Sequence, residues 1–306
     1  MLKDILDDLE SFAADNFSDD PALFLHVPFG PSDENIVEAM LELAEVGPKD
    51  LVYDLGSGDG RILIHAARHR DARGIGIDID PVRVADAMEL AGRMGVEYVV
   101  DFIEGDMFEV DISPATVVTL YLFPDINVRL RPRLLSELRP GTRIVSHAFD
   151  MGDWKPDDVL RLEGTLLYKW IVPAQVAGTW EWEGRDGTPF RVELKQKFQE
   201  VEGRAWRGGR PISLAEAKLQ GDRLELLLGD GEAGSLESFT LKFAQGKLKS
   251  VRCRRLRPGV PEAALLTEGL PPTCMAGLGR MAETALQRKA IAQGFFRRVR
   301  QLLRGA

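Results

Sequence analysis

The 306-residue chain contains only two cysteines, Cys253 and Cys274, and their spacing matches no metal-ligand pattern. Two cysteines so placed build no disulfide framework, and they fit the reducing cytoplasm, which is the compartment we expect. No apolar stretch approaches the roughly 20 residues that a membrane-spanning helix needs. The N-terminal sequence is acidic and lacks the basic start and continuous apolar run of a signal peptide, so we expect neither kind of segment.

The formal net charge is −9, which argues against a nucleic-acid-binding surface, because such a surface usually needs clustered basic residues. A basic segment at 290–306 has the pattern of an amphipathic helix. Such a helix can rest on an anionic membrane or on a partner, or it can pack on the acidic helix predicted for 1–23, within one chain or across a homodimer. We favour packing.

Strands and helices alternate from residue 51 onward. We predict strands at 51–56, 73–80, within 96–106, at 115–123 and at 143–149, and helices at 61–70, 81–95 and 127–141. A further helix, capped by Ser32 or Asp33, runs to about Val46. The alternation predicts an α/β fold, a doubly wound Rossmann-like parallel sheet with helices on both faces. The segments VLRLEG and LLYKWIV add an antiparallel pair at one edge.

The pattern changes near residue 174, where short alternating strands are separated by turn residues. We predict four parts: the helix at 1–23, the α/β domain at 24–173, a small antiparallel barrel or sandwich at 176–257, and a Pro-rich linker with a helical tail at 258–306. The β-module either covers an edge of the α/β domain or binds what that domain acts on, and we favour the cover. Its tryptophans, Trp180, Trp182 and Trp206, are predicted to be core or bridging aromatics.

The stretch VYDLGSGDGRI places Gly56, Gly58 and Gly60 in a turn between a strand and a helix, where backbone N–H groups approach a ligand. The Gly-Lys-Ser/Thr ending of a phosphate-gripping Walker loop is missing. Asp54 and Asp59 flank the glycines, and their carboxylates would repel the pyrophosphate of a dinucleotide. They suit a cationic ligand without phosphate, such as S-adenosylmethionine with its ammonium and sulfonium groups.

Further acids follow the next two strands. Asp78 stands 22 residues after Gly56, close to the offset of about 20 expected for a carboxylate on ribose hydroxyls. Asp106 is placed to meet the adenine amine. The alternative for Asp78 and Asp80 is that they only cap the next helix, and we favour that alternative for Asp80. His65 and His69 share a helix face, but no third ligand is in sight, so we expect no metal.

With these residues in place, the chain resembles a class I, or seven-strand, S-adenosylmethionine-dependent methyltransferase, whose first motif matches residues 54–60, Ser57 included. A narrower likeness rests on VPFGPS, DLGSGDGRI, LYLFPDIN, LRPGTRIVSHAF and DWKP. These resemble segments of a protein-lysine methyltransferase family with archaeal broad-specificity enzymes and mitochondrial enzymes acting on the ATP synthase c subunit and the adenine nucleotide translocase. The likeness covers about 24–173.

The resemblance implies a set of residues around the methyl donor. Pro28, Phe29 and Pro31 would close over S-adenosylmethionine, and Asp54, Gly56, Asp78 and Asp106 would hold it, leaving S-adenosylhomocysteine as product. LYLFP stands where related enzymes carry an Asn-Pro-Pro-Tyr or Asp-Pro-Pro-Tyr acceptor motif.

The acceptor side is predicted from the end of the fourth strand and the end of the fifth. Tyr121, Phe123 and Pro124 can form an apolar pocket that lowers the cost of deprotonating a lysine. His147 lies where the ligand crevice of such a sheet should open. The leading hypothesis is methylation of a protein lysine. The alternatives are methylation of a small molecule and a non-catalytic donor-binding scaffold, and RNA methylation ranks last.

Overall fold

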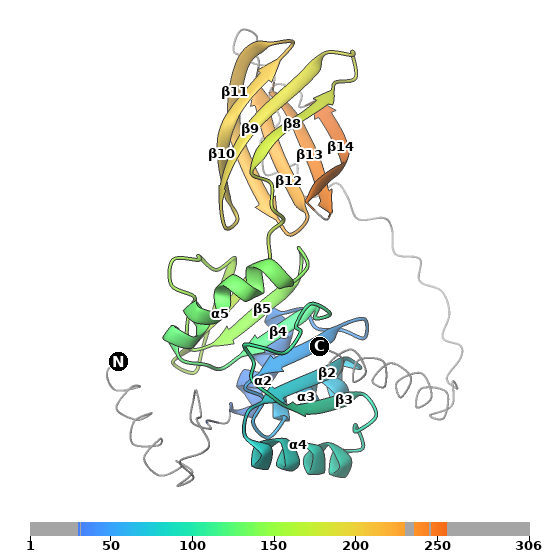
Figure 1. Ribbon diagram of the computed structural model, residues 1–306, viewed down its shortest axis with the longest axis vertical. Coiled ribbons are helices and arrows are strands. Elements are labelled where there is room, and N and C mark those ends of the chain that lie inside the picture. Colours follow the sequence, from blue (N-terminus) through green and yellow to red (C-terminus); the bar gives the residue numbers. More distant parts are fainter. Residues whose placement is uncertain (1–29, 31, 230–235, 245, 256–306) are drawn as a thin grey trace, which may run out of the picture. The chain divides into compact units, whose positions relative to one another are not determined.

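The computed structural model (Figure 1) describes residues 30, 32–229, 236–244 and 246–255. Contacts divide these residues into two compact units, with the boundary between Val172 and Pro173. Each unit has its own sheet and its own hydrophobic core. The helix predicted at 1–23 and the tail predicted at 258–306, with its basic segment 290–306, lie outside the described residues.

The first unit contains a 7-stranded sheet with the strand order β3-β2-β1-β4-β5-β7-β6. The strands are β1 Leu51–Leu55, β2 Arg73–Asp78, β3 Val100–Glu104, β4 Val117–Leu120, β5 Arg143–His147, β6 Asp158–Leu162 and β7 Thr165–Ile171. The strands from β3 to β5 pair in parallel, and β7 runs against both β5 and β6. The predicted parallel sheet with an antiparallel pair at one edge is confirmed.

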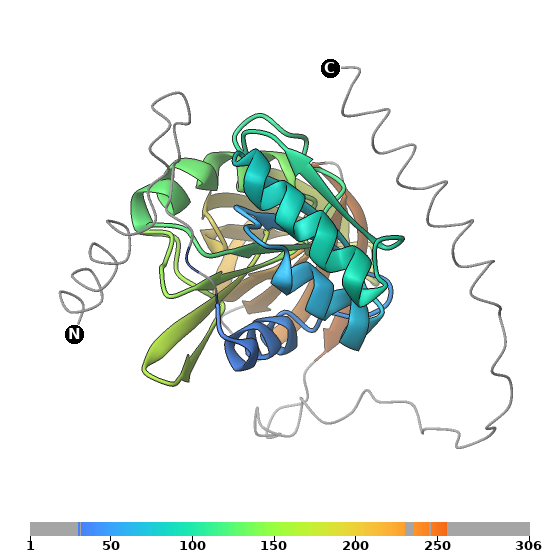
Figure 2. The same ribbon diagram turned by 90° about the horizontal axis from the view of Figure 1, so that it is seen from below.

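Helices cover both faces of this sheet. They are α2 Glu34–Leu43, α3 Arg61–Arg70, α4 Pro81–Met94 and α5 Pro124–Glu137. One core cluster joins α2, α3 and α4 to a single face of the sheet, and Figure 2 shows these blue-to-teal helices side by side. The helix α5 connects β4 to β5, in the opposite direction along the sheet from α3 and α4. Because such crossovers are right-handed, α5 lies on the other face.

The direction of the chain along the sheet reverses between β1 and β4, which pair directly, with Leu55 opposite Leu120. In an open α/β sheet, a ligand crevice forms at the carboxyl ends of the strands on either side of such a reversal. The glycine turn follows β1 and the LYLFP segment follows β4. The topology therefore brings the two predicted halves of the site to the same edge of the sheet.

Several element boundaries differ from the prediction, and two of them lie at the predicted site. The fourth strand ends at Leu120 rather than residue 123, and the following helix begins at Pro124 rather than residue 127. Phe123 is the N-cap and Pro124 the first helical residue, a position where the missing N–H of proline costs no hydrogen bond. Residues 121–123 thus form a short connection. Their side chains need not point alternately to the two faces of the sheet, as they would in a strand. Asp33 is the N-cap of α2 but makes no side-chain capping bond.

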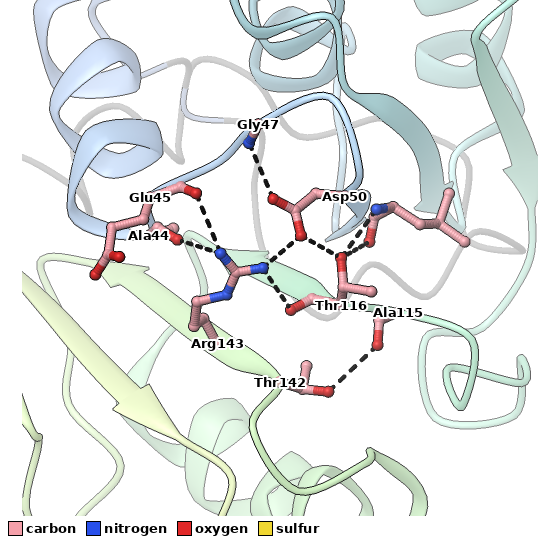
Figure 3. Close-up of polar contacts among 9 residues, drawn as sticks. Ala44, Glu45, Gly47, Asp50, Ala115, Thr116, Thr142 and Arg143 are labelled. Atoms are coloured by element: carbon pink, nitrogen blue, oxygen red, sulfur yellow. Dashed lines mark hydrogen bonds and ion pairs between the residues drawn. The ribbon is translucent and has the colours of Figure 1, made fainter. Parts of the chain in front are cut away.

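A polar cluster ties the amino-terminal ends of β1, β4 and β5 together, at the edge of the sheet away from the glycine turn (Figure 3). The Arg143 guanidinium contacts the Asp50 carboxylate and donates to the carbonyls of Ala44 at 3.0 Å and Glu45 at 3.1 Å. Thr116 Oγ1 donates to Asp50 Oδ1 at 2.8 Å. The Asp50 side chain is only 12% exposed, so these partners take the place of water around its carboxylate.

We expect Arg143→Met to lower the free energy of unfolding by about 3 kcal/mol, because it leaves the Asp50 carboxylate buried without its charge partner. Denaturant titration measures this loss. The matched control, Arg139→Met, removes an exposed arginine of the same unit and should change stability by less than about 0.5 kcal/mol. Equal stability of the two variants would show that the cluster is not structurally important.

The second unit is a 7-stranded antiparallel sheet in which each strand pairs with its neighbour in the chain. The strands are β8 Gly178–Glu183, β9 Pro189–Lys197, β10 Glu200–Arg207, β11 Arg210–Gln220, β12 Arg223–Gly229, β13 Leu236–Ala244 and β14 Lys247–Arg255. Alternate side chains of the sheet form one buried core. The predicted barrel or sandwich is therefore confirmed.

Two of the three tryptophans of this unit belong to its core, as predicted. The Trp180 ring lies 5.0 Å from that of Phe243, and the Trp182 ring lies 5.3 Å from that of Phe239. Trp206 instead lies on the outer face, with the guanidinium groups of Arg191 and Arg204 within 5.6 Å of its ring. Across the described part of the chain, no helix is long and apolar enough to cross a membrane.

Candidate active site

Asp54 is the buried acid at the carboxyl end of β1, with 3% of its surface exposed. Thr119 Oγ1, from the neighbouring strand β4, donates to Asp54 Oδ1 at 2.7 Å. Burial raises the pKa of Asp54 to about 7, and the negative charges of Asp78 and Asp59 act in the same direction. A cationic ligand group near this carboxylate would offset that effect, because an opposite charge favours the ionised form.

The glycines after Asp54 are required by the backbone of the turn. Gly56, Gly58 and Gly60 have φ values of 79°, 52° and 76°, in the left-handed region that glycine adopts at little cost. A Cβ at Gly56 would also lie 3.0 Å from Leu122 Cδ2. The turn is thus a bare backbone surface pressed against the segment that follows β4.

Asp78, at the end of β2, folds back onto the glycine turn. Its Oδ2 accepts from Gly58 N at 2.7 Å, and its Oδ1 accepts from Asp80 N at 3.0 Å. Burial raises the pKa of Asp78, although these two hydrogen bonds oppose the shift. Asp80 is the residue that caps the helix: it is the N-cap of α4, and its side chain accepts from Val82 N at 2.8 Å. Asp80 therefore caps the helix, as predicted, whereas Asp78 holds the glycine turn.

Asp59 is less available to a ligand than its place beside the glycines suggests. Arg61 binds it with Nε and Nη2, at 3.0 Å and 2.6 Å, so its charge already has a partner. The same guanidinium donates from Nη1 to the carbonyl of Ser32 at 3.0 Å. Arg61 therefore links the glycine turn to the segment before α2, a link that spacing along the chain does not reveal.

The other residues predicted to bind the methyl donor are Asp106, Ser57 and three lid residues. Asp106 follows β3, and its Oδ1 accepts from Phe108 N at 2.8 Å in a local turn. The hydroxyl of Ser57 is buried and has no hydrogen-bond partner within the described residues. The predicted lid residues Pro28, Phe29 and Pro31 lie outside the described residues.

These features fit S-adenosylmethionine. The bare turn admits a ligand to the backbone, the buried Ser57 hydroxyl is an unused hydrogen-bonding group, and Asp54 and Asp78 supply acids for cationic and hydroxyl groups. Among the described residues, the one basic side chain at the turn that could receive a pyrophosphate is Arg61, which is bound to Asp59. The side chains around the glycine turn therefore suit a cationic nucleoside without phosphate better than a dinucleotide.

The acceptor side is a stack of rings at the carboxyl ends of β4 and β5. The rings of Tyr121 and His147 are stacked with centroids 3.9 Å apart, and Phe149 lies 6.4 Å from Tyr121 and 6.0 Å from Phe123. Pro124 is exposed at the start of α5. The structure thus brings three of the four predicted residues together and adds Phe149, which follows β5.

His147 supports this stack as a neutral ring. Its Nδ1 and Ser32 Oγ form a buried hydrogen bond of 2.9 Å, whose proton position depends on the imidazole tautomer. Burial lowers the pKa of His147 to about 4, so the ring is uncharged at neutral pH. Burial also raises the pKa of Tyr121, which keeps its hydroxyl protonated. Neither ring adds a charge to the stack.

Asn127 fixes the segment that carries Phe149. It is fully buried in α5, and its Nδ2 lies 3.3 Å from the carbonyl oxygen of Phe149 and 3.2 Å from that of Asp150. Asn127 lies within the LYLFPDIN segment, but its position in the sequence alone predicted no role. A polar residue four positions after Phe123, on an otherwise apolar helix face, was the available signal.

His65 and His69, the other histidine pair, lie on the surface of α3. Their ring centroids are 4.3 Å apart, and His65 Nε2 lies 2.7 Å from Glu38 Oε2. Over the residues that the structure describes, no three His, Cys, Asp or Glu side chains form a group that could hold a metal ion.

We expect Asp54→Asn to change how stability depends on pH. The folded-state pKa of Asp54, about 7, lies above that of an unfolded aspartate. Between about pH 4 and pH 7 the folded chain keeps a proton on Asp54 that the unfolded chain has lost. The free energy of unfolding of the wild-type chain should therefore fall relative to that of the variant as the pH rises through this range. The total loss is on the order of 4 kcal/mol, and no further loss is expected above pH 7. Urea unfolding of both proteins from pH 4.5 to 8 measures the difference, and parallel curves would contradict it.

A doubly wound sheet with one reversed strand near its edge, a bare glycine turn after β1 and an acid at the end of β2 define a class I S-adenosylmethionine-dependent methyltransferase. Comparison with known proteins agrees. Residues 54–158 match the model of the ANTKMT methyltransferase domain.

Two curated relatives and one solved structure illustrate the likeness. A protein-lysine N-methyltransferase of Saccharolobus islandicus is 45% identical over 139 residues, which are 45% of this chain and 86% of that protein. The adenine nucleotide translocase lysine N-methyltransferase of Mus musculus is 34% identical over 47% of this chain and 62% of that protein. A structure titled RNA methyltransferase from Salinibacter ruber, in complex with S-adenosylhomocysteine, is 54% identical over 48% of this chain and 96% of that chain, with a TM-score of 0.48.

The chain belongs to the family of methyltransferases that contains the archaeal protein-lysine N-methyltransferase. It is a methyltransferase with S-adenosylmethionine as its methyl donor. These matches each span about half of the chain or less, and the family model ends at residue 158, before the β-module begins.

Proposed function

We propose that this methyltransferase transfers a methyl group to the side-chain amine of a lysine in a protein. The observation that carries the proposal is the uncharged aromatic stack of Tyr121, His147 and Phe149, which lies at the carboxyl ends of β4 and β5, beside the glycine turn. This stack suits an amine that must be neutral when it reacts.

A lysine amine must lose its proton before it can attack. With an ordinary pKa of about 10.4, the deprotonation costs roughly 4.6 kcal/mol at pH 7. An apolar site lowers that cost, because desolvation disfavours the ammonium form. The negative charge of Asp33, which acts on both Tyr121 and His147, opposes this effect. The buried His147 and the protonated Tyr121 provide rings of this kind. No described side chain in the stack is placed as a charged general base.

The residues of this chain have separate tasks in the proposed reaction. Bound S-adenosylmethionine supplies a methyl group on a positively charged sulfur. The glycine turn, Asp54 and Asp78 hold the donor at the end of β1. Tyr121 borders the acceptor, and its hydroxyl can orient the neutral amine. Asn127 fixes the segment of Phe149. Positioning of the two reactants is the main catalytic contribution that the chain makes.

The names of the relatives support a protein acceptor. The archaeal relative is named as a protein-lysine N-methyltransferase, and the mouse and human relatives are named for lysines of the adenine nucleotide translocase and of the ATP synthase c subunit. The chain covers 56% of that human protein, and its β-module lies outside the likeness.

Labelling tests the proposal. The purified full chain is incubated with methyl-labelled S-adenosylmethionine and a lysate of its host, which is then separated into protein and low-molecular-weight fractions. We expect label in protein bands, and none with Asp78→Ala. Label only in the small-molecule fraction would contradict a protein acceptor and assign a metabolite instead.

A further inference from the structure

The last strand of the β-module, β14, carries charge of one sign. Every charged residue of its sequence, KLKSVRCRR, is basic. Lys247, Lys249 and Arg252 are exposed, and none of the three has an ion-pair partner among the described residues. Unbalanced cations on a strand of a chain with a formal net charge of −9 are an unusual local feature.

The neighbouring strands extend this basic surface. Leu224, Leu241 and Phe243 point into the core, so alternate residues such as Arg223 and Lys242 point outward. Arg252 lies opposite Thr240, on the same outer face. Of these outward cations, Lys242 alone is paired, with Asp222 at 3.2 Å, among the residues that the structure describes. Glu225, opposite Thr240, is the one acid among the described outward residues of these strands, so the outer face of β12 to β14 carries mostly basic groups.

The same strand is an open edge of the sheet. Within the described residues, β14 pairs with β13 on one side and with no strand on the other (Figure 1). An open edge presents backbone N–H and C=O groups that can pair with another chain. One of these groups already accepts a donor, because Arg185 Nη2 donates to the carbonyl of Cys253 at 2.9 Å. The edge is therefore already occupied at Cys253 by the turn between β8 and β9, and a docking strand would pair with the remaining backbone groups of β14.

We propose that β14 is a docking strand for an extended acidic segment of a partner protein, which adds to the sheet beside it. The backbone of the segment would pair with the edge, and its carboxylates would lie against Lys247, Lys249 and Arg252. This mode combines main-chain hydrogen bonds, which give affinity, with side-chain charge, which selects the sequence.

Two other anionic partners fit the surface less well. Single-stranded nucleic acid is usually held by aromatic rings that stack on the bases. The described outward residues of β12 to β14 include no aromatic ring, since Phe239 and Phe243 point into the core. A membrane surface favours exposed apolar anchors as well as charge. Leu236 is the one large exposed hydrophobic residue found on these strands, within the described part of the chain.

Fluorescence anisotropy with a labelled peptide of about ten residues, alternating Thr and Glu, tests this docking. The full chain is used without methyl donor, so the result is independent of methyl transfer. We expect binding that Lys249→Glu with Arg252→Glu weakens at least about tenfold, because two attractive contacts become repulsive. The control, Lys195→Glu with Arg210→Glu, makes the same charge change at exposed sites on β9 and β11 and should leave binding unchanged.

A second peptide separates strand addition from simple charge attraction. N-methylation of every second residue, along one edge of the peptide, removes its main-chain donors and keeps its charge. We expect this peptide to bind at least about tenfold more weakly. The proposal is overturned if the acidic peptide does not bind, if both double variants lose binding equally, or if N-methylation has no effect. Tighter binding of oligothymidylate or of phosphatidylglycerol vesicles would also overturn it.

Discussion

Asp78→Ala is expected to weaken S-adenosylmethionine binding by roughly 10²-fold. The carboxylate lies at the end of β2, where it holds the glycine turn through Gly58 N at 2.7 Å. We expect it also to accept the ribose hydroxyls of the donor. A hydrogen bond to a charged group contributes about 1.5 to 3 kcal/mol, so loss of the carboxylate costs about 3 kcal/mol of binding free energy. Isothermal titration calorimetry of the wild-type and variant chains measures the loss.

Asp80→Ala is the matched control for Asp78→Ala. It removes a carboxylate two residues away that caps α4 through Val82 N. Loss of such a cap lowers the free energy of unfolding by about 1 kcal/mol. The affinity for S-adenosylmethionine should change by less than about twofold. If Asp80→Ala weakened donor binding as much as Asp78→Ala does, the assignment of Asp78 to the donor would fail.

Tyr121→Ala is expected to lower kcat/KM for the labelled protein acceptor by about 10²-fold and to change the affinity for the donor little. The substitution removes the ring that stacks on His147 at 3.9 Å and so opens the acceptor side to water and to misplacement of the amine. A displacement of about 1 Å at a reacting centre can cost about 10²-fold in rate. Initial-rate assays with the labelled acceptor, together with calorimetry of donor binding, measure the two effects.

Two further variants show which part of Tyr121 acts. Tyr121→Phe keeps the ring and removes the hydroxyl, so a loss of rate confined to Tyr121→Ala would assign the effect to the ring alone. Tyr98→Ala changes a half-buried tyrosine just before β3, at the opposite edge of the sheet. It should leave kcat/KM for the acceptor within about twofold of wild type. Equal losses in Tyr121→Ala and Tyr98→Ala would mean a general effect on folding rather than a role at the acceptor.

Much of the fold follows from local sequence signals. The glycines at 56, 58 and 60 predict the turn because all three adopt positive φ. The switch from strand period to helix period predicts α3 over its full length, Arg61–Arg70. The predicted end of β4 was wrong because the apolar run continues through Phe123, and an apolar run does not distinguish a buried strand from a buried connection.

The parts of the candidate site that sequence reasoning missed depend on tertiary packing. Ser32 and His147 form a hydrogen bond although they are 115 residues apart in the chain. Phe149 joins the ring stack because the segment after β5 turns back, with Ala148 at a φ of 65°. Arg61 takes up the charge of Asp59 because the first turn of α3 places the two side chains together. No periodicity or motif in the sequence encodes these contacts.

The central claim is that the site at the carboxyl ends of β1 and β4 methylates lysine. Complete acid hydrolysis of the labelled acceptor protein, followed by amino-acid analysis, tests it most directly. The account predicts that the label elutes with Nε-methylated lysine, and that label incorporation is lost with Asp78→Ala and sharply reduced with Tyr121→Ala. Label recovered in another amino acid, or released as methanol from a methyl ester, would contradict the account.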